Sequence, residues 1–181
     1  MRRKMTGISI LMITTALATV ALADHGHREH HGHRRTKAAP TTAIPAEELA
    51  RYREECGSCH LAYPPGLLPA RSWTRLMGGL DDHFGQNAEL DDATRLELTK
   101  WLEAHAAETG SHPRSAKALR SAGADTPLRI SELPYILRKH HELRDEVFTR
   151  PAVLSRANCA ACHRTAEEWV FDEDSARIPP R

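Results

Sequence analysis

The pattern C-x-x-C-H occurs twice in this chain, as CGSCH at residues 56–60 and as CAACH at residues 159–163, and the two copies contain all four cysteines. On a helix, residues at positions i, i+3 and i+4 lie on one face. Each copy would therefore present two thiols and one imidazole in the same direction. The residues between the cysteines are glycine, serine and alanine, which leave room for a large flat group beside the backbone.

This arrangement has the chemistry of covalent haem attachment. Two thiols three residues apart can form thioether bonds to the two vinyl groups on one edge of a porphyrin, and the histidine that follows then stands beneath the iron as its axial ligand. The sequence therefore predicts two haem c groups. Their attachment residues would be Cys56, Cys59 and His60 for the first haem, and Cys159, Cys162 and His163 for the second.

Two other uses of paired cysteines explain less of the pattern. Four thiolates could bind one zinc ion, although such pairs are seldom so far apart in a sequence. Disulfides or a redox-active pair would suit an exported protein. Neither use requires a histidine after each pair. Twelve of the 181 residues are histidine, so chance would place one after both pairs only about 0.4% of the time.

The second axial ligand of the first haem is not fixed by the motif. Methionine and histidine are the usual choices, and Met77 is the only methionine after residue 23, so at most one haem can have His/Met ligation. His83, in the glycine-rich segment GGLDDHFGQN (residues 78–87), is the first candidate. Met77 and His105 remain alternatives.

For the second haem, the candidates lie in RKHHEL at residues 138–143. A helix predicted over residues 131–147 would place His140 on its apolar stripe, whereas adjacent helical residues point about 100° apart, which turns His141 away. His140 is therefore the first candidate. His141 is the alternative, and His112 is a more distant one.

The N-terminus has the features of an export signal followed by a biased segment. Residues 1–23 begin with three basic residues, continue with a short apolar run and end in Ala-Leu-Ala, which predicts a cleaved signal peptide. The apolar run is short for a membrane anchor, which needs about 20 residues. Residues 24–45 contain five histidines between positions 25 and 33. We predict a disordered leader there, with metal binding by its imidazoles as the alternative.

Composition excludes one class of function. Without residues 1–23 the chain has 22 basic residues (25 less three) against 24 acidic ones, a net charge of about −2, and no basic stripe with interleaved aromatic residues, so a nucleic-acid binder is not expected. Only nine residues are Phe, Trp or Tyr. A chain so poor in aromatic side chains suits a fold whose interior is completed by another apolar group.

The remaining pattern predicts a mainly α fold with two small haem-binding modules, the first at residues 46–115 and the second at 116–181. Glycine and proline clusters predict loops over residues 61–73 and 78–87. A boundary between the modules is expected within residues 108–127. The predicted helices cover residues 46–59, 91–108, 131–147 and 151–163.

The chain also resembles the bacterial periplasmic dihaem cytochromes c over residues 47–180. The resemblance rests on the strings ECGSCHLAYPPGLLPARSW, GLDDHFGQNA, PLRISELPYILRKHHEL, NCAACH and FDEDSARIP. It implies bis-histidine ligation of both irons, by His60 with His83 and by His163 with His140. It further implies an N-terminal half like a class I cytochrome c, a less familiar C-terminal half, and haems that lie close together.

The function expected from these features is one-electron transfer in the periplasm, between a membrane or soluble donor and a small periplasmic haem protein. The resemblance implies two partners, a small oxygen-binding monohaem cytochrome c and a membrane b-type cytochrome. No catalytic residue and no membrane span after signal removal are expected. The alternatives are a dihaem subunit of a periplasmic reductase and a small dihaem peroxidase, which would need a vacant iron position.

Overall fold

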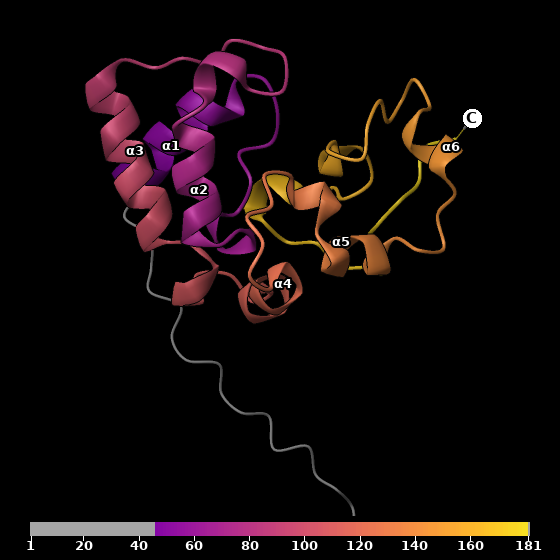
Figure 1. Cartoon of the computed structure of the whole chain (residues 1–181). Coiled ribbons are helices and arrows are strands. Elements are labelled where there is room, and N and C mark those ends of the chain that lie inside the picture. The colour runs from indigo at the N-terminus through magenta and orange to yellow at the C-terminus, as the bar shows by residue number, and fades with distance from the viewer. Residues whose placement is uncertain (1–45, 181) are drawn as a thin grey trace, which may run out of the picture. The chain divides into compact units, whose positions relative to one another are not determined.

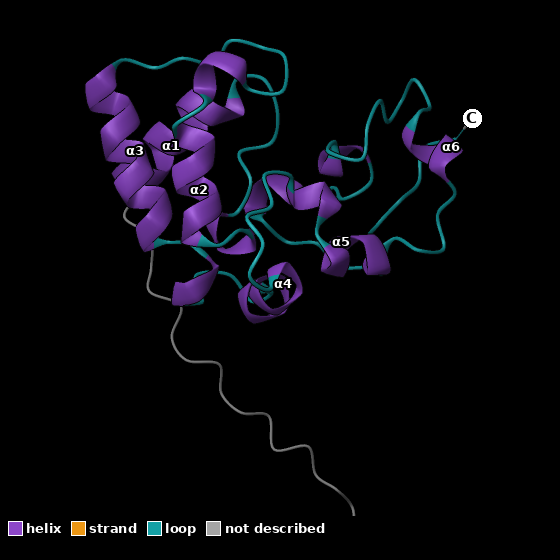
Figure 2. Ribbon diagram, in the orientation of Figure 1, coloured by secondary structure: helices purple, strands orange, loops and turns teal. Residues whose placement is uncertain are grey.

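Helices and turns make up the described part of the chain, residues 46–180 of a computed structural model (Figures 1 and 2). The predicted signal peptide (1–23) and histidine-rich leader (24–45) lie outside the described residues. Within residues 46–180 the backbone forms no named strand, and the prediction of a mainly α chain is confirmed. No helix in this range is long and apolar enough to cross a membrane.

The six α-helices are α1 (Ala46–Gly57), α2 (Ala70–Met77), α3 (Asp92–Ala104), α4 (Ser115–Ala122), α5 (Pro134–Lys139) and α6 (Asp145–Phe148). Six short 3-10 helices accompany them, at Pro65–Leu67, Leu80–Asp82, Ala107–Thr109, Ile130–Glu132, Cys159–Ala161 and Ala166–Glu168.

Local sequence signals explain where several of the predicted helices begin. Helix α3 begins where predicted, because the carboxylate of Asp91 accepts a hydrogen bond of 3.0 Å from the backbone N–H of Thr94. Helix α1 has Glu47 and Glu48 in its first turn, where negative charge favours a helix. Pro134 occupies the first turn of α5, where a proline costs no hydrogen bond.

Two short helices were not predicted. Helix α2 begins directly after Pro69, inside the segment predicted as a loop, and helix α4 lies inside the predicted module boundary. Each has only eight residues, so few apolar positions show its period. In α2 these are Trp73 and Met77, one turn apart, and in α4 they are Ala118 and Ala122. The division into modules at residues 115 and 116 stays a prediction.

Two predicted helices were wrong in extent. The helix predicted over residues 131–147 is divided into α5 and α6, because the backbone leaves the helix at His140 (φ −114°, ψ 15°) and turns before Asp145. The segment 151–163 is mostly turns, with a single 3-10 turn at Cys159–Ala161. Apolar spacing suggested a continuous helix in the first segment, and the spacing of the cysteine motif suggested one in the second, but in both the chain turns instead.

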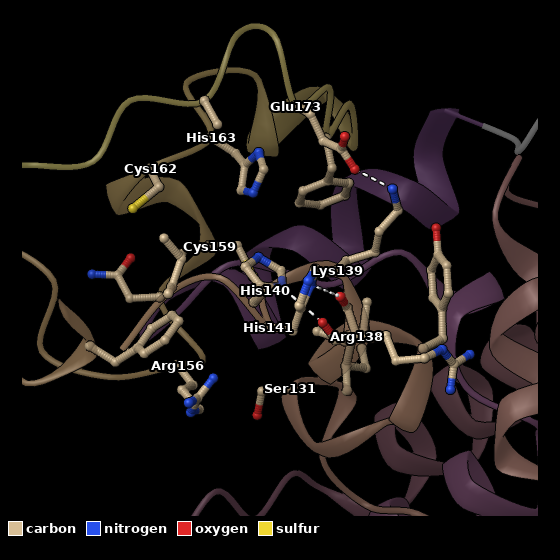
Figure 3. A pocket seen from close by; sticks show the side chains of 18 of the residues that line it. Ser131, Arg138, Lys139, His140, His141, Arg156, Cys159, Cys162, His163 and Glu173 are labelled. Carbon is tan, nitrogen blue, oxygen red and sulfur yellow. Dashed lines mark hydrogen bonds and ion pairs between the residues drawn. The ribbon is translucent and has the colours of Figure 1, made fainter. Parts of the chain in front are cut away.

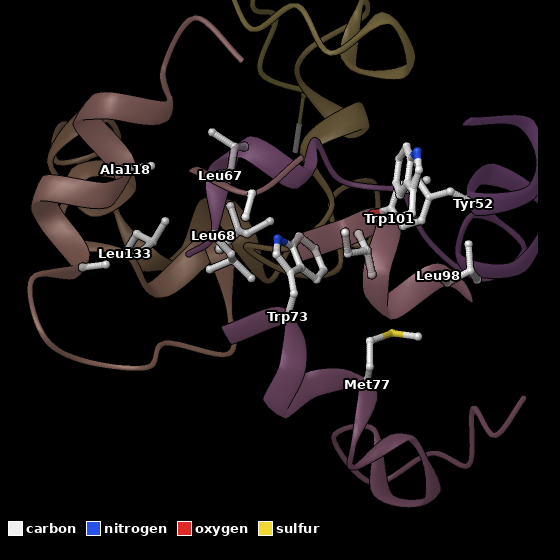
Figure 4. Packing of buried hydrophobic residues seen from close by; sticks show 14 residues of the cluster. Tyr52, Leu67, Leu68, Trp73, Met77, Leu98, Trp101, Ala118 and Leu133 are labelled. Carbon is white, nitrogen blue, oxygen red and sulfur yellow. The ribbon is translucent and has the colours of Figure 1, made fainter. Parts of the chain in front are cut away.

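The hydrophobic core lies mainly between helices α1, α2 and α3 and the loop that joins α1 to α2 (Figure 4). The rings of Tyr52 in α1 and Trp101 in α3 pack with their centroids 4.9 Å apart. The Trp73 indole donates a hydrogen bond of 2.8 Å to the Pro65 carbonyl, so this loop is fixed against α2. Met77 is 4% exposed and belongs to the same core.

The chain after α4 buries far fewer apolar side chains. In residues 124–180 the buried hydrophobic residues are Ile130, Leu133, Tyr135, Val147, Val153 and Ala166. Much of this region is held by hydrogen bonds to the first half. The Trp169 indole donates to the Ala62 carbonyl at 2.7 Å, and the Tyr63 hydroxyl donates to the Ala157 carbonyl at 2.5 Å.

One of these contacts between segments depends on a glycine. Gly66, in the 3-10 turn Pro65–Leu67, lies directly against the segment that enters α4. A Cβ atom at this position would lie 2.6 Å from the Ser111 hydroxyl, 2.9 Å from the Cβ of His112, and closer still to the Ser115 hydroxyl. The serine hydroxyls can rotate away, but the Cβ of His112 cannot, so only glycine fits without a backbone shift.

We therefore expect Gly66→Ala to destabilise the protein by about 1–3 kcal/mol, the usual cost of overpacking a tight contact. The matched control is Gly57→Ala, whose Cβ would meet its nearest neighbour at 3.7 Å. That control should be neutral or slightly stabilising, because alanine favours a helix and Ala160 holds the corresponding place in the second motif. Guanidinium unfolding of the haem-loaded protein measures both, and equal effects would contradict the close contact.

His112 is a buried polar residue of this same region, 6% exposed. Its Nδ1 accepts a hydrogen bond of 3.1 Å from the Arg114 backbone N–H, and its Nε2 donates one of 3.0 Å to the Trp169 carbonyl. Burial lowers the pKa of His112, the Arg114 charge acts in the same direction, and the bond to Trp169 opposes them. The neutral ring is therefore the form that the fold holds.

This protonation state predicts a pH-dependent stability. A histidine in the unfolded chain titrates near 6.5, and the lowered pKa of His112 makes the unfolded chain bind a proton first as the pH falls. The contribution of neutral His112 should be fully present above that pH and lost as the pH drops toward the folded-state pKa. The free energy of unfolding should therefore depend less on pH between about 5 and 7.5 in His112→Gln than in the native protein. Removing exposed His141 by His141→Gln is the control, and equal slopes in both variants would argue against this account.

Candidate functional site

The first cysteine motif begins on a helix and ends beyond it. Helix α1 ends at Gly57, so Cys56 is helical whereas Cys59 and His60 lie in the turn that follows. The expectation that one helix face carries all three residues is wrong for this copy. Burial raises the pKa of the half-buried Cys56 thiol to about 11, while Cys59 and His60 are exposed.

The imidazole of His60 is oriented by its own backbone neighbourhood. Its Nδ1 lies 2.8 Å from the Leu61 carbonyl, which can only accept, so Nδ1 carries the proton. Nε2 is then the ring nitrogen with a free lone pair. This is the usual second-shell arrangement of histidines that bind metals through Nε2.

A tight turn presents His83 to His60. The backbone N–H of His83 donates to the Gln86 carbonyl at 2.8 Å, and that of Gln86 donates back to the His83 carbonyl at 3.3 Å. Phe84 and Gly85 between them have φ values of +58° and +90°, as a type I′ turn requires. A phenylalanine with positive φ is uncommon, and the guanidinium of Arg129 lies 3.8 Å from the centroid of its ring.

His60 and His83 face one another across a gap that suits a metal. Their ring centroids are 6.1 Å apart and their planes are inclined by 23°. A metal between two imidazoles lies about 2 Å from each nitrogen, and each nitrogen lies about 1 Å from its ring centroid, which puts the centroids about 6 Å apart. The first predicted pair is thus brought together at the required spacing.

The second motif is not on an α-helix at all. Cys159 begins a 3-10 turn, Cys162 follows it, and the carbonyl of Cys159 accepts the His163 backbone N–H at 2.8 Å. Burial raises the pKa of Cys159 to about 11 and also raises that of Cys162. The predicted helix is wrong here too, because a tighter turn replaces it, although all three residues still line one cavity.

A cavity of about 510 Å³ opens beside this motif (Figure 3). Cys159, Cys162, His140 and His163 all line it, and its size is within the range of ligand and cofactor sites. The apolar part of the lining includes Leu67, Ile130, Ile136, Tyr135, Phe148 and Phe171. Few residues of this half are buried, so the cavity has room for a flat apolar group, and these side chains can cover it.

His140 and His163 meet in this cavity. Their ring centroids are 6.1 Å apart, as in the first pair, but their planes are almost perpendicular at 86°. His140 caps the C-terminal end of α5, and its Nδ1 lies 2.8 Å from the Ile136 carbonyl, which leaves Nε2 free. The second predicted pair therefore has the same spacing as the first and a different mutual orientation.

The alternative ligands lie elsewhere or have their polar atoms occupied. Met77 is in the hydrophobic core, and His105 packs on Trp101 with centroids 4.8 Å apart. Both ring nitrogens of His112 are engaged by backbone groups. His141 also lines the cavity, and its Nδ1 bond of 2.8 Å to the Arg138 carbonyl leaves Nε2 as free as that of His140. The two differ in burial, because His141 is exposed and His140 is half-buried.

In each pair the electrostatics of one ring favour neutral imidazole, the form that binds metals. Burial lowers the pKa of His83 and of His163, and the facing histidine lowers each further. The Nδ1 atoms of these two rings are buried and have no hydrogen-bond partner within the described part of the chain.

Tyr63 was not predicted as a site residue, yet it lies next to His60 of the first pair and also lines the cavity of the second pair. Its ring centroid is 5.3 Å from that of His60, and its side chain also lines the cavity of the second motif. Its hydroxyl bonds the carbonyl of Ala157, two residues before Cys159. Its place three residues after the first motif was the available signal, but the partner segment is 94 residues away in the sequence.

The donor set fits haem c better than the other uses of cysteine. Within residues 46–180 no three His, Cys, Asp or Glu side chains are grouped to hold a bare metal ion, which excludes a four-thiolate site there. The four thiols form no disulfide with one another. Two thiols beside a pair of facing imidazoles are what a covalently attached haem requires.

Known proteins share this organisation. Residues 52–171 match the family model described as dihaem cytochrome c. A solved structure of a diheme cytochrome c from Rhodobacter sphaeroides is 46% identical, with a TM-score of 0.59, and the match covers 67% of this chain and 95% of that one. The diheme cytochrome type c from Shewanella baltica OS155 is 37% identical, with a TM-score of 0.61 and coverage of 75% and 95%.

A second structure of the Rhodobacter sphaeroides protein is 43% identical over 67% of this chain and 96% of that one, with a TM-score of 0.56. None of the curated proteins compared gives a significant match. The family match spans most of the described residues and includes both motifs. This chain belongs to the dihaem cytochrome c family, and it is therefore an electron-transfer cytochrome with two covalently bound haem c groups.

Proposed function

We propose that both irons have two histidine ligands, His60 with His83 and His163 with His140, and that the protein is a periplasmic one-electron carrier. The observation that carries this proposal is the 6.1 Å spacing of ring centroids in both pairs. It matches the centroid spacing of about 6 Å that an iron between two imidazoles needs. Cys56, Cys59, Cys159 and Cys162 would hold the porphyrins by thioether bonds.

Two occupied axial positions decide what kind of chemistry is possible. A haem supplies a one-electron redox couple at iron, and a six-coordinate iron offers no position to a substrate. Histidine in place of methionine also lowers the reduction potential. Burial would keep His83 and His163 neutral, and the Nδ1 bonds of His60 and His140 would orient the other two rings.

The proposal includes a location and two partners. Export is supported by the signal-like sequence of residues 1–23, since bacterial haem c is attached outside the cytoplasmic membrane. For partners we propose a small oxygen-binding monohaem cytochrome c and a membrane b-type cytochrome, and the support is the family resemblance.

Carbon monoxide should not bind the reduced native protein, whereas a peroxidase with a vacant iron position would bind it.

The ligand choice at the second haem can be tested with adjacent residues. His140→Ala should convert one of the two haems to a high-spin, ligand-binding form, because the iron loses one imidazole, whereas His141→Ala should leave both low-spin. Visible spectra with and without carbon monoxide measure the change. A pyridine haemochrome assay should give two c-type haems per chain in each variant, which separates lost ligation from lost attachment. High-spin haem in His141→Ala alone would transfer the role to that residue.

The different ring orientations predict two distinct spectra. Parallel imidazole planes, as in the His60–His83 pair, split the two iron d orbitals that point between the ligands, whereas perpendicular planes, as in His140–His163, leave them nearly equal in energy. The oxidised protein should thus show two low-spin EPR signals, with the larger g anisotropy at the second haem. His83→Ala should abolish the less anisotropic signal and retain the other. Two identical signals would refute the orientations.

A further inference from the structure

Charge is distributed unevenly between the two halves of the chain. Residues 46–115 contain 12 acidic and seven basic residues, a net charge of −5, whereas residues 116–181 contain ten acidic and 11 basic residues, a net charge of +1. The second of these two segments therefore carries more positive charge than the first. Such an asymmetry orients a charged partner before contact is made.

The positive charge gathers in a groove between helices α4 and α5, which pack against one another. Lys117 and Arg120 line it from α4, and Arg138 and Lys139 line it from α5. The other lining residues are Ser121, Pro134 and Tyr135, so the groove has four cations and no carboxylate. We call these four cations and the space between them the α4–α5 basic groove.

Most of this charge has no partner within the chain. Lys139 forms an ion pair with Glu173 (Figure 3), but within residues 46–180 Lys117, Arg120 and Arg138 have no carboxylate within 4.0 Å. Like charges on one groove repel each other and add nothing to the stability of the fold. Their natural complement is negative charge on another molecule.

The groove is next to the second haem site. Tyr135, Arg138 and Lys139 line both the groove and the cavity that contains His140 and His163. Electron transfer weakens steeply with distance, so a redox partner must dock close to the group with which it exchanges an electron. A partner seated on the α4–α5 basic groove would lie beside the second haem rather than the first.

We propose that the α4–α5 basic groove is the docking surface for an acidic redox protein that exchanges electrons with the second haem. This inference rests on the proposed electron-transfer function and adds the charge and the place of one partner. All four cations are exposed and they come from two different helices, which fits an extended acidic protein surface better than a single small anion. Steering by complementary charge mainly raises the association rate.

The probe for the test is a reduced plant-type [2Fe–2S] ferredoxin, an acidic carrier with a potential of about −400 mV. One electron leaves its cluster and one ferric haem iron becomes ferrous, with no atom transferred. Stopped-flow spectroscopy gives the second-order rate constant. For the native protein this constant should fall at least tenfold between about 10 and 300 mM salt, because screening weakens the attraction.

The decisive comparison uses two variants with the same net charge. Lys117→Glu with Arg138→Glu reverses two groove cations, whereas Arg75→Glu with Lys100→Glu reverses two exposed cations on α2 and α3. At low salt the groove variant should react about tenfold more slowly and lose most of its salt dependence, and the control should change less than twofold. Equal slowing of both variants, or no slowing of either, overturns the proposal.

Two further readouts separate this proposal from others. Low-spin spectra and two haems per chain in both variants show that the redox centres are intact, so a failure of docking is distinguished from a failure of the proposed function. A rate constant that rises with salt in the native protein also overturns the acidic partner. Co-sedimentation with phosphatidylglycerol vesicles tests a membrane surface as the partner. If the groove variant loses vesicle binding but keeps the native rate constant with ferredoxin, the groove binds a membrane instead and the proposal is overturned.

Discussion

The facing of two imidazoles across about 6 Å is the constraint on which the local structure around both motifs depends. In the first pair a tight turn, in which Phe84 takes a positive φ, presents His83 to His60. In the second pair, α5 ends at His140 although the apolar pattern continues beyond it. Strained or interrupted backbone of this kind is common where a fold serves a site.

The two halves meet this constraint with very different resources. The first half has an ordinary core, in which three helices pack around Tyr52, Trp73 and Trp101. The second half has few buried apolar side chains and a cavity of about 510 Å³ in their place. A covalently held haem would serve there as the missing part of the core, so the cofactor would contribute to folding as well as to function.

The sequence predicted the chemistry of the site better than its backbone. The scarcity of methionine pointed to histidine ligands, the glycine-rich segment pointed to His83 and helical phase pointed to His140. The structure places each with its ring centroid 6.1 Å from that of the expected neighbour. Helical phase was a poorer guide to the backbone, because it supposed a helix that continues past His140. Apolar spacing records which side of a segment is buried, but it does not record where a distant segment makes the chain turn. The short α2 and α4 were missed for a related reason, since eight residues show too little of a period.

The hydrogen bonds that join the halves also bear on how the protein is made. Tyr63 bonds a carbonyl 94 residues later and the Trp169 indole bonds one 107 residues earlier, so the last part of the chain closes over the first. Contacts so distant in sequence form late, because the entropy of closing a long loop must be overcome first. The hydrogen bonds made by Tyr63 and Trp169 should therefore form after the local structure around the first motif. The Trp169 indole would then act as a latch, which fixes the C-terminal segment only after the rest of the chain has folded.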